Sequence, residues 1–189
     1  DPRSFVRTDA RRGLIAEHTS GTSGTPLTLW ISRADYQSWY ALAEARWRRW
    51  YGVGRADRWA IIGGQPVAPP GATAPPYWVW NAAMHQLYLS SYHVAESTAA
   101  AYVDALDRHR ITYLLGYPSA IHALAAACRR QGVRPKALRV VIANAEPVLA
   151  HQREAITEVF GCPVRETYGM AEYVTGASAC EHDTLHAWP

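Results

Sequence analysis

Residues 18–26 read His18-Thr19-Ser20-Gly21-Thr22-Ser23-Gly24-Thr25-Pro26, so that two glycines stand among five hydroxyl side chains. Hydroxyl groups and backbone N–H groups at a turn can surround phosphate oxygens, and glycine lets the backbone approach them closely. A P-loop would have a lysine directly after its second glycine, but Thr25 and Pro26 follow Gly24 here. The stretch therefore predicts a phosphate-binding loop that is not of the kinase or GTPase type. The simpler alternative is a Ser/Thr-rich surface turn.

Two segments farther along the chain extend this pattern. Ala143-Asn144-Ala145-Glu146-Pro147 follows one apolar stretch, and Tyr168-Gly169-Met170-Ala171-Glu172 follows another. Together with residues 18–26, these segments resemble the motifs of the adenylate-forming, or acyl-activating, enzymes, and they occur in the same order. Residues 11–15 and 115–119 resemble more narrowly the branch that holds phenylacetate-CoA ligase, coenzyme F390 synthetase and the CapK-like proteins. The resemblance covers nearly the whole chain.

The resemblance implies a site for ATP, or AMP, built from all three segments. The phosphates would be held by Thr19, Ser20, Gly21, Thr22, Ser23, Gly24 and Thr25. The adenine would lie between Tyr168 and Gly169 on one side and Asn144, Ala145, Glu146 and Pro147 on the other. Asn144 stands where glycine is commoner, and we expect the turn to survive because asparagine tolerates positive φ. Without the motif, Tyr168 would be interpreted as a buried tyrosine with a satisfied hydroxyl group.

The same resemblance makes Glu172 the catalytic residue and the ligand of the Mg²⁺ ion that ATP carries, since Mg²⁺ prefers carboxylate and phosphate oxygens. Without the motif, a glutamate in this position would be interpreted as a solvated surface charge. Ala171 stands where many relatives have threonine, so one hydroxyl donor to the phosphate is missing. The acyl group would lie against Tyr117, Ala143, Gly169 and Met170, with residues 77–80 as a further wall.

Cys180 and His186 form a separate pair after the tyrosine-glycine segment. A thiolate and an imidazole are reasonable zinc ligands, but a structural zinc site needs four, so two more would have to come from sequence beyond this chain. In the phenylacetate-CoA ligase branch a cysteine and a histidine recur after this segment, and the resemblance associates them with a bound metal. The alternative is a free cysteine and a surface histidine.

The composition is that of a soluble globular protein, with 49% hydrophobic and 19% charged residues in a chain of 189. No run approaches the roughly 18 apolar residues of a membrane span, and the first residues show no signal-peptide pattern, so we expect a cytoplasmic location and no membrane partner. Three widely spaced cysteines argue against a disulfide framework. Three arginines and two tryptophans stand together at residues 46–50. A solvated helix face explains this cluster better than a nucleic-acid partner does, because the net charge is only +3.

Alternating helical and strand patterns predict an α/β fold with a mostly parallel sheet and flanking helices, part of the large N-terminal domain of an adenylate-forming enzyme. A helix is expected from residue 33 to 50, capped by Ser32, with an aromatic stripe that we assign to the core rather than to a cofactor site. Further helices are expected at residues 97–110, 118–131 and 148–160, and strands at 58–62, 86–90, 111–115, 138–142 and 164–167. Ligands of such sheets bind beyond the carboxyl ends of the strands, where residues 116–117, 144–146 and 168–169 fall.

Lys136 is the only lysine, and its context differs from that of the lysine that the family carries on a C-terminal lid domain. We therefore expect residues 1–189 to be a partial N-terminal AMP-binding domain, inactive by itself. The full protein would activate an aromatic or otherwise apolar carboxylic acid as an acyl-adenylate and transfer it to CoA or another acceptor. The alternatives are a non-catalytic nucleotide-binding or interaction module, and a CapK-like ligase of polysaccharide biosynthesis.

Overall fold

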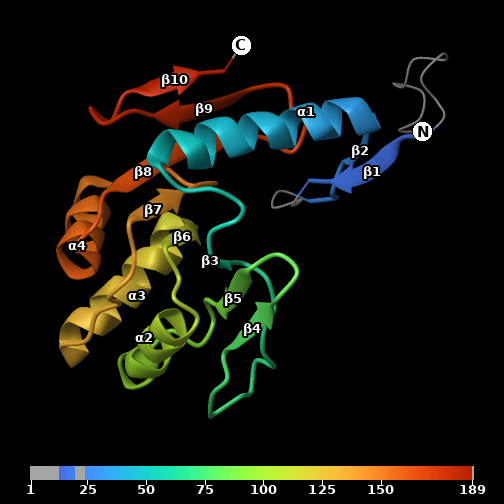
Figure 1. Cartoon of the computed structure of the whole chain (residues 1–189). Helices are drawn as coiled ribbons and strands as arrows, with labels where there is room; N and C mark the ends of the chain where they lie inside the picture. The colour runs from blue at the N-terminus through green and yellow to red at the C-terminus, as the bar shows by residue number, and fades with distance from the viewer. Residues whose placement is uncertain (1–12, 20–23, 189) are drawn as a thin grey trace.

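The computed structural model of the chain describes residues 13–19 and 24–188. Within these residues, one sheet has eight strands in the order β10-β9-β8-β7-β6-β3-β5-β4 (Figure 1). The strands are β3 (Trp59–Gly63), β4 (Trp78–Asn81), β5 (Gln86–Ser90), β6 (Tyr113–Gly116), β7 (Val140–Ala143), β8 (Val164–Gly169), β9 (Gly176–Ala179) and β10 (Leu185–Ala187). Strands β8, β7, β6, β3 and β5 run parallel, and β4, β9 and β10 are antiparallel additions at the edges. The predicted α/β fold with a mostly parallel sheet is confirmed.

Three helices cover one face of the parallel strands: α2 (Ala99–Arg108), α3 (Pro118–Gln131) and α4 (Ala150–Phe160) (Figure 1). Proline at the first position of α3 suits a helix start, and left-handed glycines end α3 and α4 at Gly132 and Gly161. Strands β6 and β7 are buried along their whole length, as expected for the interior of a parallel sheet. Leu114 and Val141 point into the main core under the helices.

The opposite face of β6 and β7 carries a second, smaller core, because successive residues of a strand point to opposite faces. Its buried members are Val53, Trp59, Tyr113, Leu115, Val140 and Ile142. Tyr51 and Val53 cover it from the end of a continuous helical segment. This segment consists of α1 (Arg33–Ala43), a π-helical turn (Glu44–Arg48, the π turn) and a 3-10 turn (Arg49–Tyr51). The predicted cap is present, since Ser32 Oγ accepts a hydrogen bond of 3.1 Å from the backbone N–H of Asp35.

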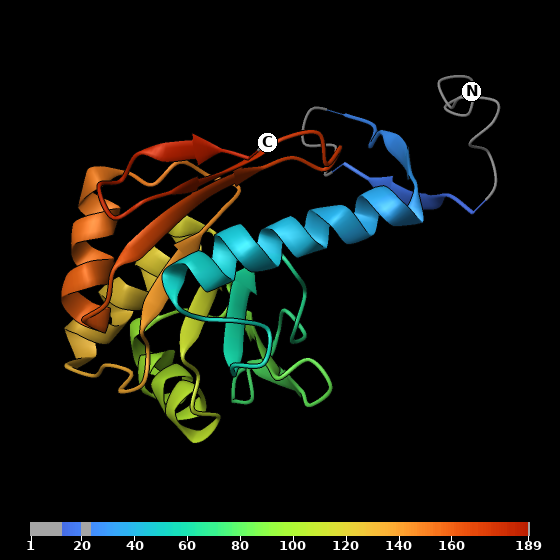
Figure 2. The ribbon, with the colours of Figure 1, turned by 45° about the horizontal axis from the view of Figure 1, so that its top comes forward.

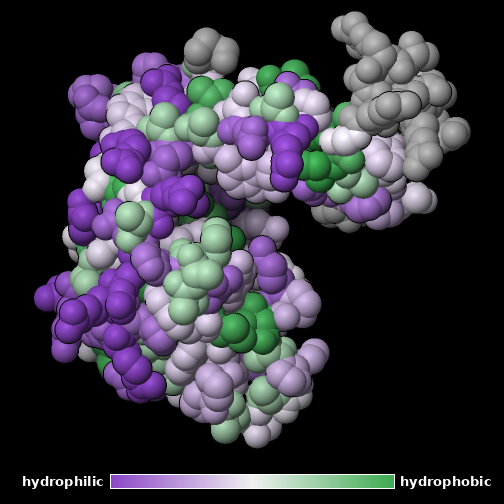
Figure 3. Space-filling model, turned by 45° about the vertical axis from the view of Figure 1, so that its right-hand side comes forward, coloured by the Kyte–Doolittle hydropathy of each residue, from purple (hydrophilic) through white to green (hydrophobic). Residues whose placement is uncertain are grey.

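Helix α1 lies across the sheet, and the β1–β2 hairpin lies at its far end, away from α2, α3 and α4 (Figure 2). The hairpin consists of β1 (Ile15–His18) and β2 (Thr28–Ile31), which pair antiparallel. The surface is notched between this arm and the body of the sheet (Figure 3). Trp39, Ala43 and the C-terminal Trp188 form a third buried cluster, which fixes α1 against β9 and β10. None of the helices in the described part of the chain is long and apolar enough to cross a membrane.

Candidate functional site

The loop that follows β7 is tied to its neighbours by backbone and side-chain hydrogen bonds. The backbone N–H of Asn144 donates to the carbonyl of Gly116, at the end of β6, over 3.0 Å. The carboxylate of Glu146 accepts from both the backbone N–H and the hydroxyl of Ser119, each at 3.0 Å. Ser119 is the second residue of α3, so a negative charge sits at the positive end of that helix. Glu146 therefore holds the loop in place through α3.

The turn in this loop has its left-handed residue at a different position from the one predicted. Ala145, not Asn144, has positive φ, at 67°. This conformation is unfavourable for alanine because its Cβ approaches a backbone oxygen. The tolerance of asparagine for positive φ is therefore not what preserves the turn. The hydrogen bonds of Asn144 and Glu146 on either side hold Ala145 in this conformation.

A cavity of about 340 Å³, the tryptophan cavity, opens between the helical segment and the ends of β7 and β8. It is lined by Trp39, Tyr40, Ala43, Trp47, Arg48, Trp59, Leu115, Asn144, Ala145, Gly169, Met170, Ala171 and Tyr173. Gly169 is essential to its shape, because a Cβ there would lie 3.1 Å from the ring of Trp47 and 3.3 Å from that of Trp39. Several residues of the two C-terminal motifs thus come together with side chains from α1 and the π turn.

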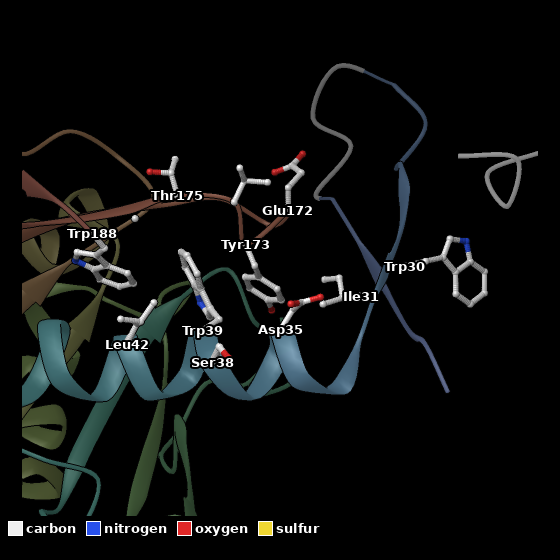
Figure 4. Close-up of a pocket in the computed structure, with 12 residues that line it drawn as sticks. Trp30, Ile31, Asp35, Ser38, Trp39, Leu42, Glu172, Tyr173, Thr175 and Trp188 are labelled. Carbon is white, nitrogen blue, oxygen red and sulfur yellow. The ribbon is translucent and has the colours of Figure 1, made fainter. Parts of the chain in front are cut away.

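A second cavity, of about 380 Å³, lies beside the first and is called the Glu172 cavity here (Figure 4). Its wall comes from β2, α1 and the β8–β9 loop: Trp30, Ile31, Asp35, Ser38, Trp39, Leu42, Glu172, Tyr173, Val174, Thr175, Gly176 and Trp188. Tyr173 points from the loop down onto α1, whereas the carboxylate of Glu172 points away from the helix (Figure 4). Trp39 and Tyr173, with ring centroids 5.1 Å apart, belong to both cavities and separate them.

The electrostatics of the two cavities differ. Glu172 is half-buried, and within the described part of the chain its carboxylate forms no ion pair. In the tryptophan cavity, Arg48 is paired with Glu44 at 3.3 Å, but the same carboxylate also pairs with Arg49 at 3.1 Å, so the three side chains together carry one positive charge. Burial raises the pKa of Tyr40 and of Tyr173, so both phenols stay neutral at physiological pH. One cavity therefore offers a carboxylate without an ion-pair partner in the described chain, and the other a largely aromatic wall that includes one arginine.

The predicted phosphate loop connects β1 and β2. Thr19, Gly24 and Thr25 belong to the described residues, whereas Ser20, Gly21, Thr22 and Ser23 lie outside them. The backbone N–H of Thr19 donates to Leu27, and the N–H of Leu27 donates to Thr19 Oγ1 at 2.9 Å, which closes the base of the loop. Because β2 supplies Trp30 and Ile31 to the Glu172 cavity, the loop and Glu172 belong to neighbouring parts of the molecule.

The predicted acyl-site residues do not all meet. Met170 and Gly169 line the tryptophan cavity. Ala143 is fully buried, and its side chain packs into the main core on the helix side. Tyr117 is 37% exposed, and its ring lies 3.7 Å from where a Cβ on Gly64 would stand, next to β3 rather than in the cavity. Tyr168 is also at the surface, with 51% of its area exposed.

Residues 77–80, predicted as a further acyl wall, lie elsewhere. Residues 78–81 form the edge strand β4, at the opposite end of the sheet from β9 and β10, and Trp78 and Trp80 pack against the main core. The aromatic wall of the tryptophan cavity comes from the stripe of α1 and the π turn. That stripe was a visible signal in the sequence, but its period of three and four is equally that of a helix packed on a core.

Cys180 and His186 lie on the β9–β10 hairpin. The backbone N–H of Cys180 donates to Thr184 over 3.0 Å, and His186 is paired with Ser178. The imidazole of His186 meets the ring of Trp50 edge-on, with centroids 5.7 Å apart. Among the described residues, no group of three or more His, Cys, Asp or Glu side chains could hold a metal ion. The structure thus provides at most two of the four ligands that a structural zinc site needs.

Comparison with known proteins connects this geometry to a family. A family model described as "AMP-binding enzyme" matches residues 6–188. The protein CapK of Staphylococcus aureus is 25% identical over 168 residues, which cover 88% of this chain and 37% of CapK. An open conformation of 2-hydroxyisobutyryl-CoA ligase in complex with 2-HIB-AMP and CoA superposes with a TM-score of 0.59 at 18% identity, over 93% of this chain and 41% of that one. An acyl-CoA synthetase of Brucella canis gives a TM-score of 0.54 at 23% identity, over 83% and 27%. The chain spans less than half the length of each of these proteins.

Proposed function

The chain belongs to the family of AMP-binding enzymes, and from this membership we propose that the protein activates a carboxylic acid with ATP. In this reaction a carboxylate oxygen of the acid bonds to the α-phosphorus, the bond from that phosphorus to the bridging oxygen breaks, and pyrophosphate leaves. The observation that carries the proposal is the pair of adjacent cavities that share Trp39 and Tyr173. One borders a carboxylate and the phosphate-loop hairpin, and the other is a small aromatic chamber.

The nucleotide is assigned to the edge formed by the three motifs. Residues 19–25 hold the phosphates, while Tyr168, Gly169 and residues 144–147 hold the adenine. The tied loop after β7 supports this assignment, because a wall fixed by Asn144 and Glu146 need not be reordered when the nucleotide binds. The main task of such a site is to hold the carboxylate of the acid beside the phosphates of ATP, although these two anions repel each other.

Glu172 fits the role of Mg²⁺ ligand. Its carboxylate is half-buried at a cavity and has no cationic partner in the described chain, and Mg²⁺ is commonly bound by one or two carboxylates together with substrate phosphates. When bound, Mg²⁺ supplies positive charge beside the phosphate oxygens. Ala171 contributes no hydroxyl group, so backbone N–H groups and residues 19–25 carry the remaining donors.

The acid is assigned to the tryptophan cavity, and we infer an aromatic or otherwise apolar acid because the wall is mostly aromatic. A volume of about 340 Å³ is at the small end of ligand pockets. CoA, or another thiol or amine, then accepts the acyl group. The similarity to CapK favours a second candidate, a ligase of polysaccharide biosynthesis with a sugar amine as acceptor. Ala171, which lacks a hydroxyl donor, and Leu27, which supplies no charge after Pro26, favour a third, a nucleotide-binding module without catalysis.

Acid-dependent exchange of pyrophosphate into ATP tests the proposal in the full-length protein. We expect Glu172→Gln to lower the exchange rate by at least about 100-fold, because removing one preorganised electrostatic partner typically costs about 3 kcal/mol. Thermal stability should change little, since Glu172 lies in a loop outside the core. Glu154→Gln, an exposed carboxylate on α4, is the matched control and should exchange normally. Normal exchange by Glu172→Gln would remove Glu172 from this role.

A further inference from the structure

Tyr173 has a backbone conformation that bulky residues rarely adopt. Its φ is 56°, in the left-handed region, and its backbone N–H donates to the carbonyl of Met170 over 3.2 Å, so residues 170–173 form a tight turn after β8. Met170, at the start of this turn, lines the tryptophan cavity, whereas Glu172 lines the Glu172 cavity. The directions of both side chains therefore depend on a turn that is locally unfavourable.

The ring of Tyr173 holds this turn against α1. Its centroid lies 5.1 Å from that of Trp39, and it meets the ring of Tyr36 edge-on with centroids 5.7 Å apart. Trp39 is buried and packs in turn on Trp47 and Trp188, at centroid distances of 6.2 Å and 5.2 Å, so it forms a fixed platform. Aromatic pairs at these distances are favourable, and two of them oppose the tendency of the turn to relax. The ring contacts therefore select the left-handed conformation against the local preference of the chain.

We propose that Tyr173 is the positioning residue that aims the carboxylate of Glu172; this inference rests on the proposed role of Glu172 as Mg²⁺ ligand. The two residues are adjacent, and their side chains point in opposite directions, Tyr173 down onto α1 and Glu172 away from it (Figure 4). When the ring is packed on Trp39, the backbone that precedes it is fixed, and so is the direction of the carboxylate. Without the ring, the turn returns to negative φ and the carboxylate samples several directions, so that it holds Mg²⁺ less well. The hydroxyl group of Tyr173 has no part in this role, because the ring makes both contacts.

Calorimetric titration of the full-length protein with ATP, in the absence of any acid, tests the proposal by binding rather than by activity. The quantity is the magnesium gain, which is the Kd of ATP in EDTA divided by its Kd with Mg²⁺. We expect Tyr173→Ala to reduce the magnesium gain about 10-fold, as when a group that orients a metal ligand is removed, and to leave the Kd of AMP unchanged. Tyr173→Gly should lose as much, because glycine relieves the backbone but lacks the ring.

Two control variants accompany this titration. Tyr173→Phe keeps the ring and should keep the magnesium gain. Tyr92→Ala removes an exposed tyrosine that lines neither cavity, and it should keep the gain as well. A loss of the gain in Tyr173→Phe would assign the effect to the hydroxyl group and would overturn the role of the ring.

The variants separate a positioning role from a structural one. An unchanged magnesium gain in Tyr173→Ala would overturn the proposal, and so would a gain that is lost in Tyr173→Ala but kept in Tyr173→Gly, since the backbone alone would then aim Glu172. Equal losses of affinity for AMP and for ATP with Mg²⁺ would make Tyr173 a merely structural residue. If Tyr173→Ala fails to fold, Tyr173→Gly decides alone, because glycine adopts positive φ freely.

The unaltered protein separates this inference from the proposed function. If it binds ATP equally well with and without Mg²⁺, Glu172 loses its role as Mg²⁺ ligand and the inference about Tyr173 falls with it. Acid activation is read separately, from acid-dependent pyrophosphate exchange, and stands or falls on that result.

Discussion

At the scale of single residues, Ala145 and Gly169 show how the backbone shapes the site. Ala145 holds a left-handed conformation, with φ of 67°, in the loop that carries Asn144 and Glu146. Gly169 lets two indole rings close over the end of β8, where a Cβ would lie 3.1 Å from Trp47. In both places the geometry serves the cavity rather than the local preference of the chain, which is typical of functional sites.

Ala145→Gly tests the conformation of the loop. Glycine adopts positive φ without the penalty that alanine carries, and this gain exceeds the extra chain entropy that glycine loses on folding. We expect the free energy of unfolding to rise by up to about 1 kcal/mol. Ala137→Gly, in a loop where φ is not positive, is the control and should lower it by about 0.5–1 kcal/mol. Urea denaturation measures both, and equal losses would show that Ala145 is not left-handed in solution.

At the scale of elements, the π turn decides which side chains reach the cavity. Helix α1 ends at Ala43, and the helical path continues through the π turn of residues 44–48. A π turn holds one more residue than an α-helical turn, so it changes the direction of the side chains that follow, and such turns are frequent at functional sites. Here the turn carries Trp47 and Arg48, which both line the tryptophan cavity.

The contact between Glu146 and α3 is expected to stabilise the loop after β7. Glu146→Gln keeps the shape but weakens both hydrogen bonds to Ser119 and removes the charge from the helix N-terminus. We expect a loss of about 1 kcal/mol in the free energy of unfolding. Ser119→Ala should remove part of the same energy, so the double variant should lose less than the sum of the two. Additive losses in this double-mutant cycle would mean that the two side chains do not interact.

The β9–β10 hairpin gives a prediction about zinc. Cys180 and His186 should bind zinc only when sequence beyond Pro189 supplies further ligands, because two ligands do not make a structural site. Elemental analysis of the longer protein should show about one zinc per chain, and Cys180→Ser should reduce it strongly. His182→Ala is the control, since this exposed imidazole lies on the same hairpin. Equal, near-zero zinc in the longer protein and in Cys180→Ser would restore the free-cysteine interpretation.

At the scale of the whole molecule, the order of the motifs was enough to predict that residues of the two C-terminal motifs come together. Parallel strands end at one edge, so Asn144, Gly169 and Glu172 come to the same side of the sheet. Alternation explains the main exception: neighbouring residues of a strand face opposite ways, and Ala143 points into the helix-side core. The role of Trp39 and Trp47 could not be predicted, because an aromatic stripe looks the same whether a helix covers a core or a cavity.

Five strands of three or four residues, β1, β2, β4, β9 and β10, were not predicted, whereas the equally short β6 and β7 were. β6 and β7 are buried along their whole length and therefore appear as continuous apolar runs, whereas the other five lie toward the ends of the sheet or in the separate hairpin. Their pairing is set by partners that lie next to them only in the folded chain. The sheet edges and the hairpin that carries the phosphate loop were therefore invisible to periodicity, although the loop itself was recognised from its glycines and hydroxyl groups.

The last prediction concerns the 189-residue chain by itself. It contains the hairpin, the loop after β7, Tyr168 and Glu172, so we expect it to bind adenine nucleotide. We expect the Kd to lie between about 10 μM and 1 mM, roughly 4–7 kcal/mol, because part of the binding surface would be missing. Calorimetric titration with ATP and Mg²⁺ measures this affinity, and Glu172→Gln should weaken binding of ATP with Mg²⁺ more than binding of AMP alone.

The same chain should not complete adenylation. Its only lysine, Lys136, follows α3 and its C-terminal turn and does not line either cavity. Without a cation that closes over the α-phosphate, the charge that develops there stays solvated, and the barrier is not lowered by a preorganised partner. A pyrophosphate-release assay over a panel of hydroxylated, aryl and alkyl acids should therefore give the background rate. Robust acid-dependent release from these 189 residues would show that a lid lysine is dispensable, and would make the chain a complete catalyst rather than part of one.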